Sequence, residues 1–125
     1  MDAVETHLPC SDAAPARARA FLRDTLATWA VDGASSVAEV LATELVSNVV
    51  RHVRAPMTLR VVLVDACLRV EVDDPSPELP VPRLPREVDV DGRGLLLVES
   101  LARRWGVTPH DREGKTVWFE LDATH

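Results

Sequence analysis

Five prolines fall between residues 75 and 85, and this cluster limits the fold more than any other feature of the chain. Proline lacks a backbone N–H and fixes φ, so a segment this rich in proline forms neither a helix interior nor a central strand. We therefore predict a long irregular loop over residues 74–93. A loop of that length in a small domain is usually functional or disordered. The regular structure must come from the residues on either side of it.

An amphipathic helix is predicted near the start of the chain. It is capped by Ser11 or Asp12, accepts Pro15 in its first turn and runs to about Ala30. Its apolar residues recur at spacings of three and four, which is typical of a helix with one buried face.

Two further helices are expected. The first of them begins where Ser36 and Glu39 fit a capping box, and it runs to about Arg54. The second follows the proline-rich loop, covers residues 95–102 and ends near Trp105. Both are bounded by residues that stop a helix, a proline in one case and a glycine in the other.

The remaining residues are typical of β-strands. An edge strand is expected at residues 4–9, and alternating or β-branched runs predict strands at 58–64, 68–72, 107–110 and 116–121. Helices interleaved with hairpins favour an α/β (α+β) two-layer sandwich. We expect a mixed, mostly antiparallel sheet that is covered on one face by three helices, with residues 1–125 forming a single domain.

Composition excludes several classes of protein. The chain has 125 residues and a net charge of −6, whereas nucleic-acid-binding domains usually carry a basic excess. It has no apolar run of the roughly 20 residues that a membrane helix needs, and because its first residues are acidic we expect no signal peptide. Two cysteines do not form a disulfide framework. We expect a cytoplasmic protein with reduced thiols, no membrane contact, no direct nucleic-acid contact, and Trp29, Trp105 and Trp118 in its core.

Two polar residues of the second helix lie in an unexpected place. At about 100° per residue, Glu44 and Asn48 fall within the apolar stripe. Burying an unpaired carboxylate or amide costs several kcal/mol, so these groups have buried partners or line a cavity. An amide oxygen is a hard ligand for Mg²⁺, and a carboxylate beside it can orient or deprotonate a nucleophile. Hydrogen bonds to neighbouring backbone or arginine side chains are the alternative.

Two other places contain groups suited to a ligand. Asp73 and Asp74 end a predicted strand, so alternation points one of them into the sandwich, where a carboxylate can accept from an exocyclic amine. Ordinary turn chemistry is the alternative there. Gly92 and Gly94 precede a predicted helix, whose N-terminal N–H groups suit phosphate.

Taken together and in order, these segments resemble the motifs of the histidine-kinase-like ATPase superfamily, the Bergerat fold. The resemblance covers residues 14 to 122, and it is closest to the short anti-sigma-factor serine kinases of bacterial partner-switching systems. The matching segments are the N box ELVSNVVRH (44–52), the two glycine boxes VEVDDPSPELP (70–80) and GRGLLLV (92–98), and the closing strand GKTVWFEL (114–121).

The resemblance implies a role for each matching residue. Asn48 would bind a Mg²⁺ ion that bridges the phosphates of ATP or ADP, and Glu44 would be the catalytic base or water-orienting carboxylate. Asp74 would accept the adenine amino group, with the Thr116 hydroxyl assisting. Lys115 would contact phosphate.

The second glycine box would supply the phosphate lid. Gly92 and Gly94 would shape it, the backbone amides of Leu95 and Leu96 would face the phosphates, and Arg93 would contact them.

The same resemblance implies a regulatory kinase that phosphorylates a small antagonist protein, sequesters a sigma factor and works as a homodimer. Two departures favour a second hypothesis, because Ser76 and Glu78 replace the glycines of the first glycine box. In that hypothesis the domain holds nucleotide, or once did, and regulates by protein contact without phosphotransfer. A third hypothesis is an α/β interaction domain with no nucleotide site.

Overall fold

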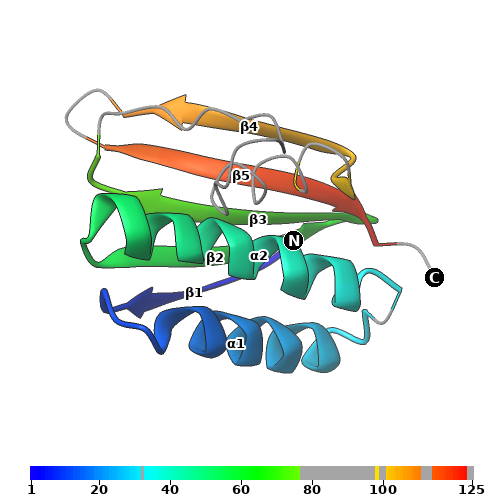
Figure 1. Ribbon diagram of the computed structural model, residues 1–125. Coiled ribbons are helices and arrows are strands. Elements are labelled where there is room, and N and C mark those ends of the chain that lie inside the picture. The colour runs from blue at the N-terminus through cyan, green and yellow to red at the C-terminus, as the bar shows by residue number, and fades with distance from the viewer. Residues whose placement is uncertain (32, 77–97, 99–100, 111–113, 124–125) are drawn as a thin grey trace.

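The computed structural model describes residues 1–31, 33–76, 98, 101–110 and 114–123, which form two layers (Figure 1). Two helices, α1 and α2, lie side by side on one face of a five-stranded sheet. The elements are β1 (Asp2–Leu8), α1 (Ala14–Thr28), α2 (Ser35–Asn48), the π-helical turn η1 (Val49–Val53), β2 (Met57–Val64), β3 (Cys67–Asp74), β4 (Arg104–Pro109) and β5 (Lys115–Asp122).

The sheet has the order β1-β2-β3-β5-β4, and each neighbouring pair is antiparallel. The predicted two-layer α/β sandwich is confirmed, and the pairings among the described strands are all antiparallel rather than mixed. Of the third predicted helix, Val98 and Leu101 are helical and Ala102 follows them outside any helix or strand, whereas residues 95–97, 99 and 100 lie outside the described part of the chain. Residues 77–93 of the predicted loop lie outside it as well.

Neither helix begins with the predicted side-chain cap. The N-cap residues are Ala13 for α1 and Ala34 for α2, and neither makes a side-chain cap hydrogen bond. The capping box at Ser36 was wrong because the Glu39 carboxylate has other partners. It accepts from the Ser35 hydroxyl at 3.1 Å and from an Arg23 guanidinium N–H at 3.2 Å.

The second helix also ends differently from the prediction. Its α-helical part stops at Asn48, and the chain continues as the π-helical turn η1. The N–H of Arg54 donates to the carbonyl of Val49 at 2.8 Å, which is the i to i+5 bond of a π-helix. Arg54 then adopts a left-handed conformation with φ of 55° and ends the helix.

The core lies between the helices and the inner face of the sheet. Alternation along β3 turns Leu68, Val70, Val72 and Asp74 inward, and Phe119 of β5 packs beside them. The helices contribute small and branched apolar residues to the same layer. These include Ala18, Leu22, Leu26, Ala38, Leu41, Ala42, Leu45 and Val46.

The outer face of the sheet carries a network of charges instead. Arg60 donates to Glu5, Glu71 and Asp73, which raises the pKa of its guanidinium chiefly through the bond to Glu71. Arg69 lies 4.0 Å from the centroid of the Trp118 ring. The prediction that Trp118 belongs to the core was therefore wrong, because alternation along β5 places it on this outer face.

The strand β4 replaces the predicted end of the third helix. It begins at Arg104, and Trp105 pairs with Phe119 in the register of β4 and β5. Trp29 and Trp105 are partly buried and pack against the core. Both cysteines are free thiols. No helix in the described residues is long and apolar enough to cross a membrane.

Acid should weaken the outer face at Glu120. Burial raises the pKa of this carboxyl, but the hydrogen bonds from Arg69 and Arg104 outweigh burial and hold the pKa below its ordinary value of 4.5. A carboxyl whose folded-state pKa is lowered stabilises the fold above its unfolded-state pKa, and that contribution is lost as pH falls below about 4.5. Glu120→Gln should lower the free energy of unfolding at pH 7 and flatten its decline below pH 5 in denaturant titrations. Parallel pH profiles for the two proteins would contradict this account.

Candidate functional site

Helix α2 places Glu44 and Asn48 one turn apart on the flank of its buried face. Val40 is 47% exposed while Val46 is fully buried. The buried face of α2 is therefore rotated away from Val40 and toward Val46, compared with the apolar stripe that the sequence predicted. Glu44 and Asn48 are both half-buried at its edge. The residues predicted to sit within the apolar stripe therefore border it.

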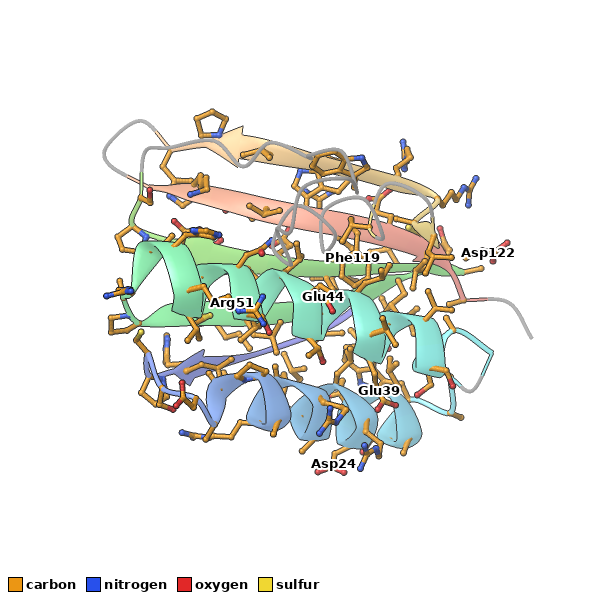
Figure 2. The ribbon with its side chains drawn as sticks, viewed as in Figure 1. Asp24, Glu39, Glu44, Arg51, Phe119 and Asp122 are labelled. Atoms are coloured by element: carbon orange, nitrogen blue, oxygen red, sulfur yellow. The ribbon has the colours of Figure 1, made fainter. Side chains whose placement is uncertain are left out.

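The opposite flank of α2 faces α1. Glu39 pairs with Arg23 of α1, and Figure 2 shows Glu39 on the α1 side of α2. At about 100° per residue, Glu44 and Asn48 are turned roughly 140° to 180° away from Glu39. Their flank therefore faces the half of the inner sheet surface that β3 and β5 form, away from α1.

The amide oxygen of Asn48 is the most telling atom on this flank. Asn48 Oδ1 is buried and has no hydrogen-bond partner among the residues that the structure describes. A buried polar atom without a partner costs about 1–3 kcal/mol, so native structures rarely keep one without a reason. A hard oxygen ligand of this kind suits Mg²⁺, which is commonly held by one or two protein groups together with phosphates and water. The Asn48 amide oxygen is therefore suited to bind the Mg²⁺ ion that the sequence motifs imply.

A buried ion pair closes the inner face at the ends of β3 and β5. Lys115 Nζ lies 3.0 Å from Asp74 Oδ1, and the two side chains are only 5% and 1% exposed. The backbone N–H of Ser76 donates to the same Asp74 oxygen at 2.8 Å, and Lys115 Nζ donates to the Ser76 carbonyl at 3.2 Å. Together these bonds fix the first residues after β3.

Gly114 allows β5 to start this close to β3. Its φ is +110°, and a Cβ at this position would lie 2.7 Å from the Asp74 carbonyl oxygen. A residue with a side chain would therefore be strained in its backbone and would clash with the end of β3. The glycine keeps Lys115 within reach of Asp74.

The two acidic residues at the end of β3 point to opposite faces, as predicted. Asp74 is buried on the inner face, whereas Asp73 is half-buried on the outer face, where it accepts from Arg60 and from the hydroxyl of Thr116. The register of β3 and β5 pairs Asp73 with Thr116 and Asp74 with Lys115. Thr116 was expected to assist Asp74 through its hydroxyl. In the structure the sheet separates these two side chains, and the Thr116 hydroxyl donates to Asp73 instead.

Lys115 also differs from its predicted place. Its ammonium group is bound to Asp74 and Ser76 rather than standing free for phosphate. The sequence contained the signal that would have found this pairing. Counting the alternation of an antiparallel β3 and β5 puts Lys115 on the same face as Asp74 and Thr116 on the other.

These residues gather at one end of the sandwich. The end of α2, the turn η1, the end of β3 and the start of β5 all lie there (Figure 1). Asn48 is the last residue of α2, Asp74 the last of β3 and Lys115 the first of β5, so all three belong to elements whose ends lie at this end of the sandwich, with Glu44 one turn before Asn48. The predicted lid residues, Gly92, Arg93, Gly94, Leu95 and Leu96, lie outside the described residues.

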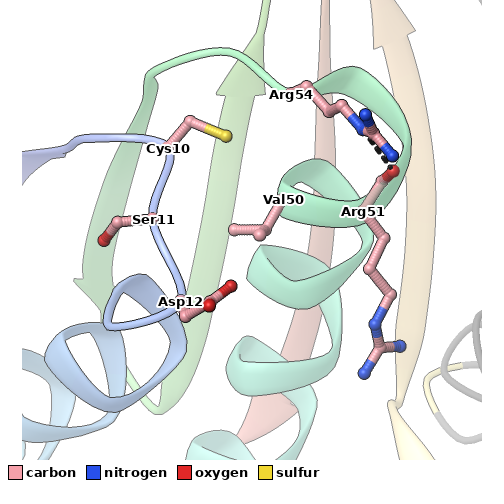
Figure 3. A pocket seen from close by; sticks show the side chains of 6 residues that line it. All are labelled: Cys10, Ser11, Asp12, Val50, Arg51 and Arg54. Carbon is pink, nitrogen blue, oxygen red and sulfur yellow. Dashed lines mark hydrogen bonds between the residues drawn. The ribbon is translucent and has the colours of Figure 1, made fainter.

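A separate open pocket of about 430 Å³ lies on the other flank of the helix (Figure 3). None of the predicted site residues lines it. Its lining residues are Cys10, Ser11, Asp12, Val50, Arg51 and Arg54. Across the described part of the chain, no three His, Cys, Asp or Glu side chains are grouped to hold a metal ion.

The sequence matches the family of histidine kinase-like ATPase domains over residues 8–121. No curated protein matches it. A solved structure of the RsbU and RsbW domains of Rv1364c from Mycobacterium tuberculosis superposes with a TM-score of 0.76 at 20% identity. That match covers 100% of this chain and 33% of the other.

A second solved structure is similar over most of this chain. It is the histidine kinase domain of the Erythrobacter litoralis EL346 blue-light activated histidine kinase, with a TM-score of 0.54 at 19% identity. The match covers 93% of this chain and 62% of that chain, so this chain spans less than two thirds of either relative. At such low identity the two likenesses establish the fold.

The buried ion pair predicts a clear effect on stability. Removing one partner of a buried pair leaves an uncompensated charge, which typically costs about 3–5 kcal/mol. Lys115→Met should lower the free energy of unfolding by about this amount in urea titrations, and adding Asp74→Asn should recover a large part of it. A single variant as stable as the wild type, or a double variant no more stable than the single one, would contradict the pair as described.

Proposed function

This chain belongs to the family of histidine kinase-like ATPase domains, and on that basis we propose that it is a regulatory domain that binds Mg-ATP. The nucleotide would lie between α2 and the ends of β3 and β5. The observation that carries the proposal is the buried Asn48 Oδ1, which has no hydrogen-bond partner among the described residues. Its helix flank faces the inner sheet surface that ends at Asp74.

Asn48 and Asp74 would hold the two ends of the nucleotide. Asn48 would hold Mg²⁺ through Oδ1, and the ion, when bound, neutralises charge on the phosphates. Asp74 would accept from the exocyclic amine of adenine. Its Oδ1 already accepts from Ser76 and Lys115, and neither of these bonds uses Oδ2. That second oxygen is the acceptor we assign to the base.

Glu44 would act on the nucleophile in phosphotransfer. The hydroxyl oxygen of a serine or threonine forms a bond to the γ-phosphorus while the bond from that phosphorus to the bridging oxygen of ADP breaks. ADP leaves with that electron pair, and the Glu44 carboxylate accepts the hydroxyl proton. Glu44 is half-buried one turn before Asn48, the residue proposed to hold the ion at the phosphates, and this spacing supports the role.

The partners we propose are those of a partner-switching kinase. The domain would phosphorylate a small antagonist protein and sequester a sigma factor, acting in the cytoplasm as a homodimer without direct contact to nucleic acid. Two observations support this: the sequence motifs resemble anti-sigma-factor serine kinases, and one structure with the same fold contains an RsbW domain.

One observation favours a second candidate function. In the first glycine box Ser76 stands where a glycine is usual, and both its N–H and its carbonyl are bound to the Asp74–Lys115 pair. A segment held in this way has less freedom to close over a nucleotide. The second candidate is therefore a nucleotide-binding regulatory module that acts through protein contact and transfers no phosphate.

Calorimetric titration tests the binding part of the proposal. The wild-type protein should bind ATP and ADP with micromolar affinity, and Mg²⁺ should strengthen the binding. Asn48→Ala should remove most of that Mg²⁺ effect, because it deletes the only proposed protein ligand of the ion, whereas Ser47→Ala is the matched control on the neighbouring residue. A Mg²⁺ effect that persists in folded Asn48→Ala would contradict the role of Asn48.

Transfer of labelled γ-phosphate to candidate antagonist proteins tests the kinase. Glu44→Gln should slow transfer by about a hundredfold or more, since it removes the proton acceptor, while ATP affinity changes little. Glu39→Gln on the α1 side of the same helix is the control and should transfer at the wild-type rate. Transfer that survives in Glu44→Gln would exclude this role, and a wild type that binds ATP but transfers nothing would favour the second candidate.

A further inference from the structure

The pair formed by Lys115 and Asp74 contains more hydrogen-bonding capacity than its internal bonds use. A lysine ammonium has three donors and no acceptor. Two donors are used among the described residues, one by Asp74 Oδ1 at 3.0 Å and one by the Ser76 carbonyl at 3.2 Å. The pair therefore offers one further donor from Lys115, beside the Oδ2 acceptor of Asp74.

Burial makes this arrangement specific. The Lys115 and Asp74 side chains are 5% and 1% exposed, so water has little access to either. A ligand that leaves a buried donor or acceptor unpaired loses much of its affinity, because the site cannot compensate with solvent. A donor next to an acceptor therefore selects a ligand edge that carries an acceptor next to a donor.

Adenine has such an edge, with its exocyclic amine next to the ring nitrogen N1. We propose that Lys115 is a specificity-determining residue for the base: it holds the Asp74 carboxylate through Oδ1, leaves Oδ2 for the amine, and donates its third N–H to N1. The proposal rests on the proposed function, since it concerns the base end of the same pocket. Hypoxanthine carries a carbonyl and an N–H at these two positions, so it presents the reverse pattern to the pair.

The competing arrangement uses the same residues differently. The Lys115 ammonium could take the place that the amine of adenine would otherwise occupy, in which case it would block the pocket. The two arrangements predict opposite effects of removing the ammonium. If Lys115 donates to the base, Lys115→Met weakens ATP binding, and if Lys115 blocks the site, the same change strengthens it.

Calorimetry with base analogues tests the proposal on the unaltered protein. ATP should bind about tenfold to a hundredfold more tightly than 1-deaza-ATP, which keeps the amine but lacks N1, because a hydrogen bond to a charged group is lost. Inosine triphosphate should bind more weakly than ATP by at least the same factor. Equal affinity for ATP and 1-deaza-ATP would overturn the proposal while leaving ATP binding itself established.

Variants of Lys115 assign the effect to this residue. In Lys115→Met, ATP should bind about tenfold to a hundredfold more weakly, and the preference for ATP over 1-deaza-ATP should disappear. If that variant does not fold, the comparison of ATP with 1-deaza-ATP on the wild-type protein still tests the proposal. Tighter ATP binding in Lys115→Met would overturn the proposal in favour of a blocking lysine. A wild-type protein that binds no ATP would defeat the proposed function and this inference together.

Discussion

The antiparallel register of β3 and β5 is the constraint on which the site depends. It pairs Asp74 with Lys115 and Asp73 with Thr116, so neighbouring residues of the same strands serve opposite faces of the sheet. The inner pair lies at the end of an otherwise apolar surface, where two charges are stable only because they neutralise each other. Residues of the outer pair join the network of arginines and carboxylates that covers the face without helices. A shift of β5 by one residue in this register would move Lys115 to the outer face and Thr116 to the inner face.

Helix α2 supplies the other half of the site from one of its two flanks, while the other flank packs against α1. The flank with Glu39 is committed to α1 by the pair with Arg23. The flank with Glu44 and Asn48 is turned away from α1, toward the part of the inner sheet surface that ends at Asp74. The π-helical turn follows directly after Asn48, and such turns are frequent at functional sites.

Much of this arrangement follows from local sequence patterns. The strands, the two helices and the inward Asp74 were predictable because periodicity and alternation fix which face is buried. The predicted capping box was wrong because the Glu39 carboxylate accepts hydrogen bonds from Arg23 and Ser35, and neither residue is part of the capping-box motif. Alternation along β5 shows which faces Lys115 and Thr116 occupy, but the residues of β3 that they meet depend on strand register, which is a long-range property. Trp118 was predicted to lie in the core, although its alternation with Phe119 along β5 places it on the outer face.

We propose that the inner region bounded by Asn48, Asp74 and Lys115 holds Mg²⁺ and an adenine nucleotide. A crystal structure of the chain with Mg²⁺ and a non-hydrolysable ATP analogue tests it most directly. The account predicts a metal ion on Asn48 Oδ1, with the amine of adenine on Asp74 Oδ2. A nucleotide bound elsewhere, for example in the pocket lined by Cys10 and Arg54, or a metal ion that does not contact Asn48, would contradict it.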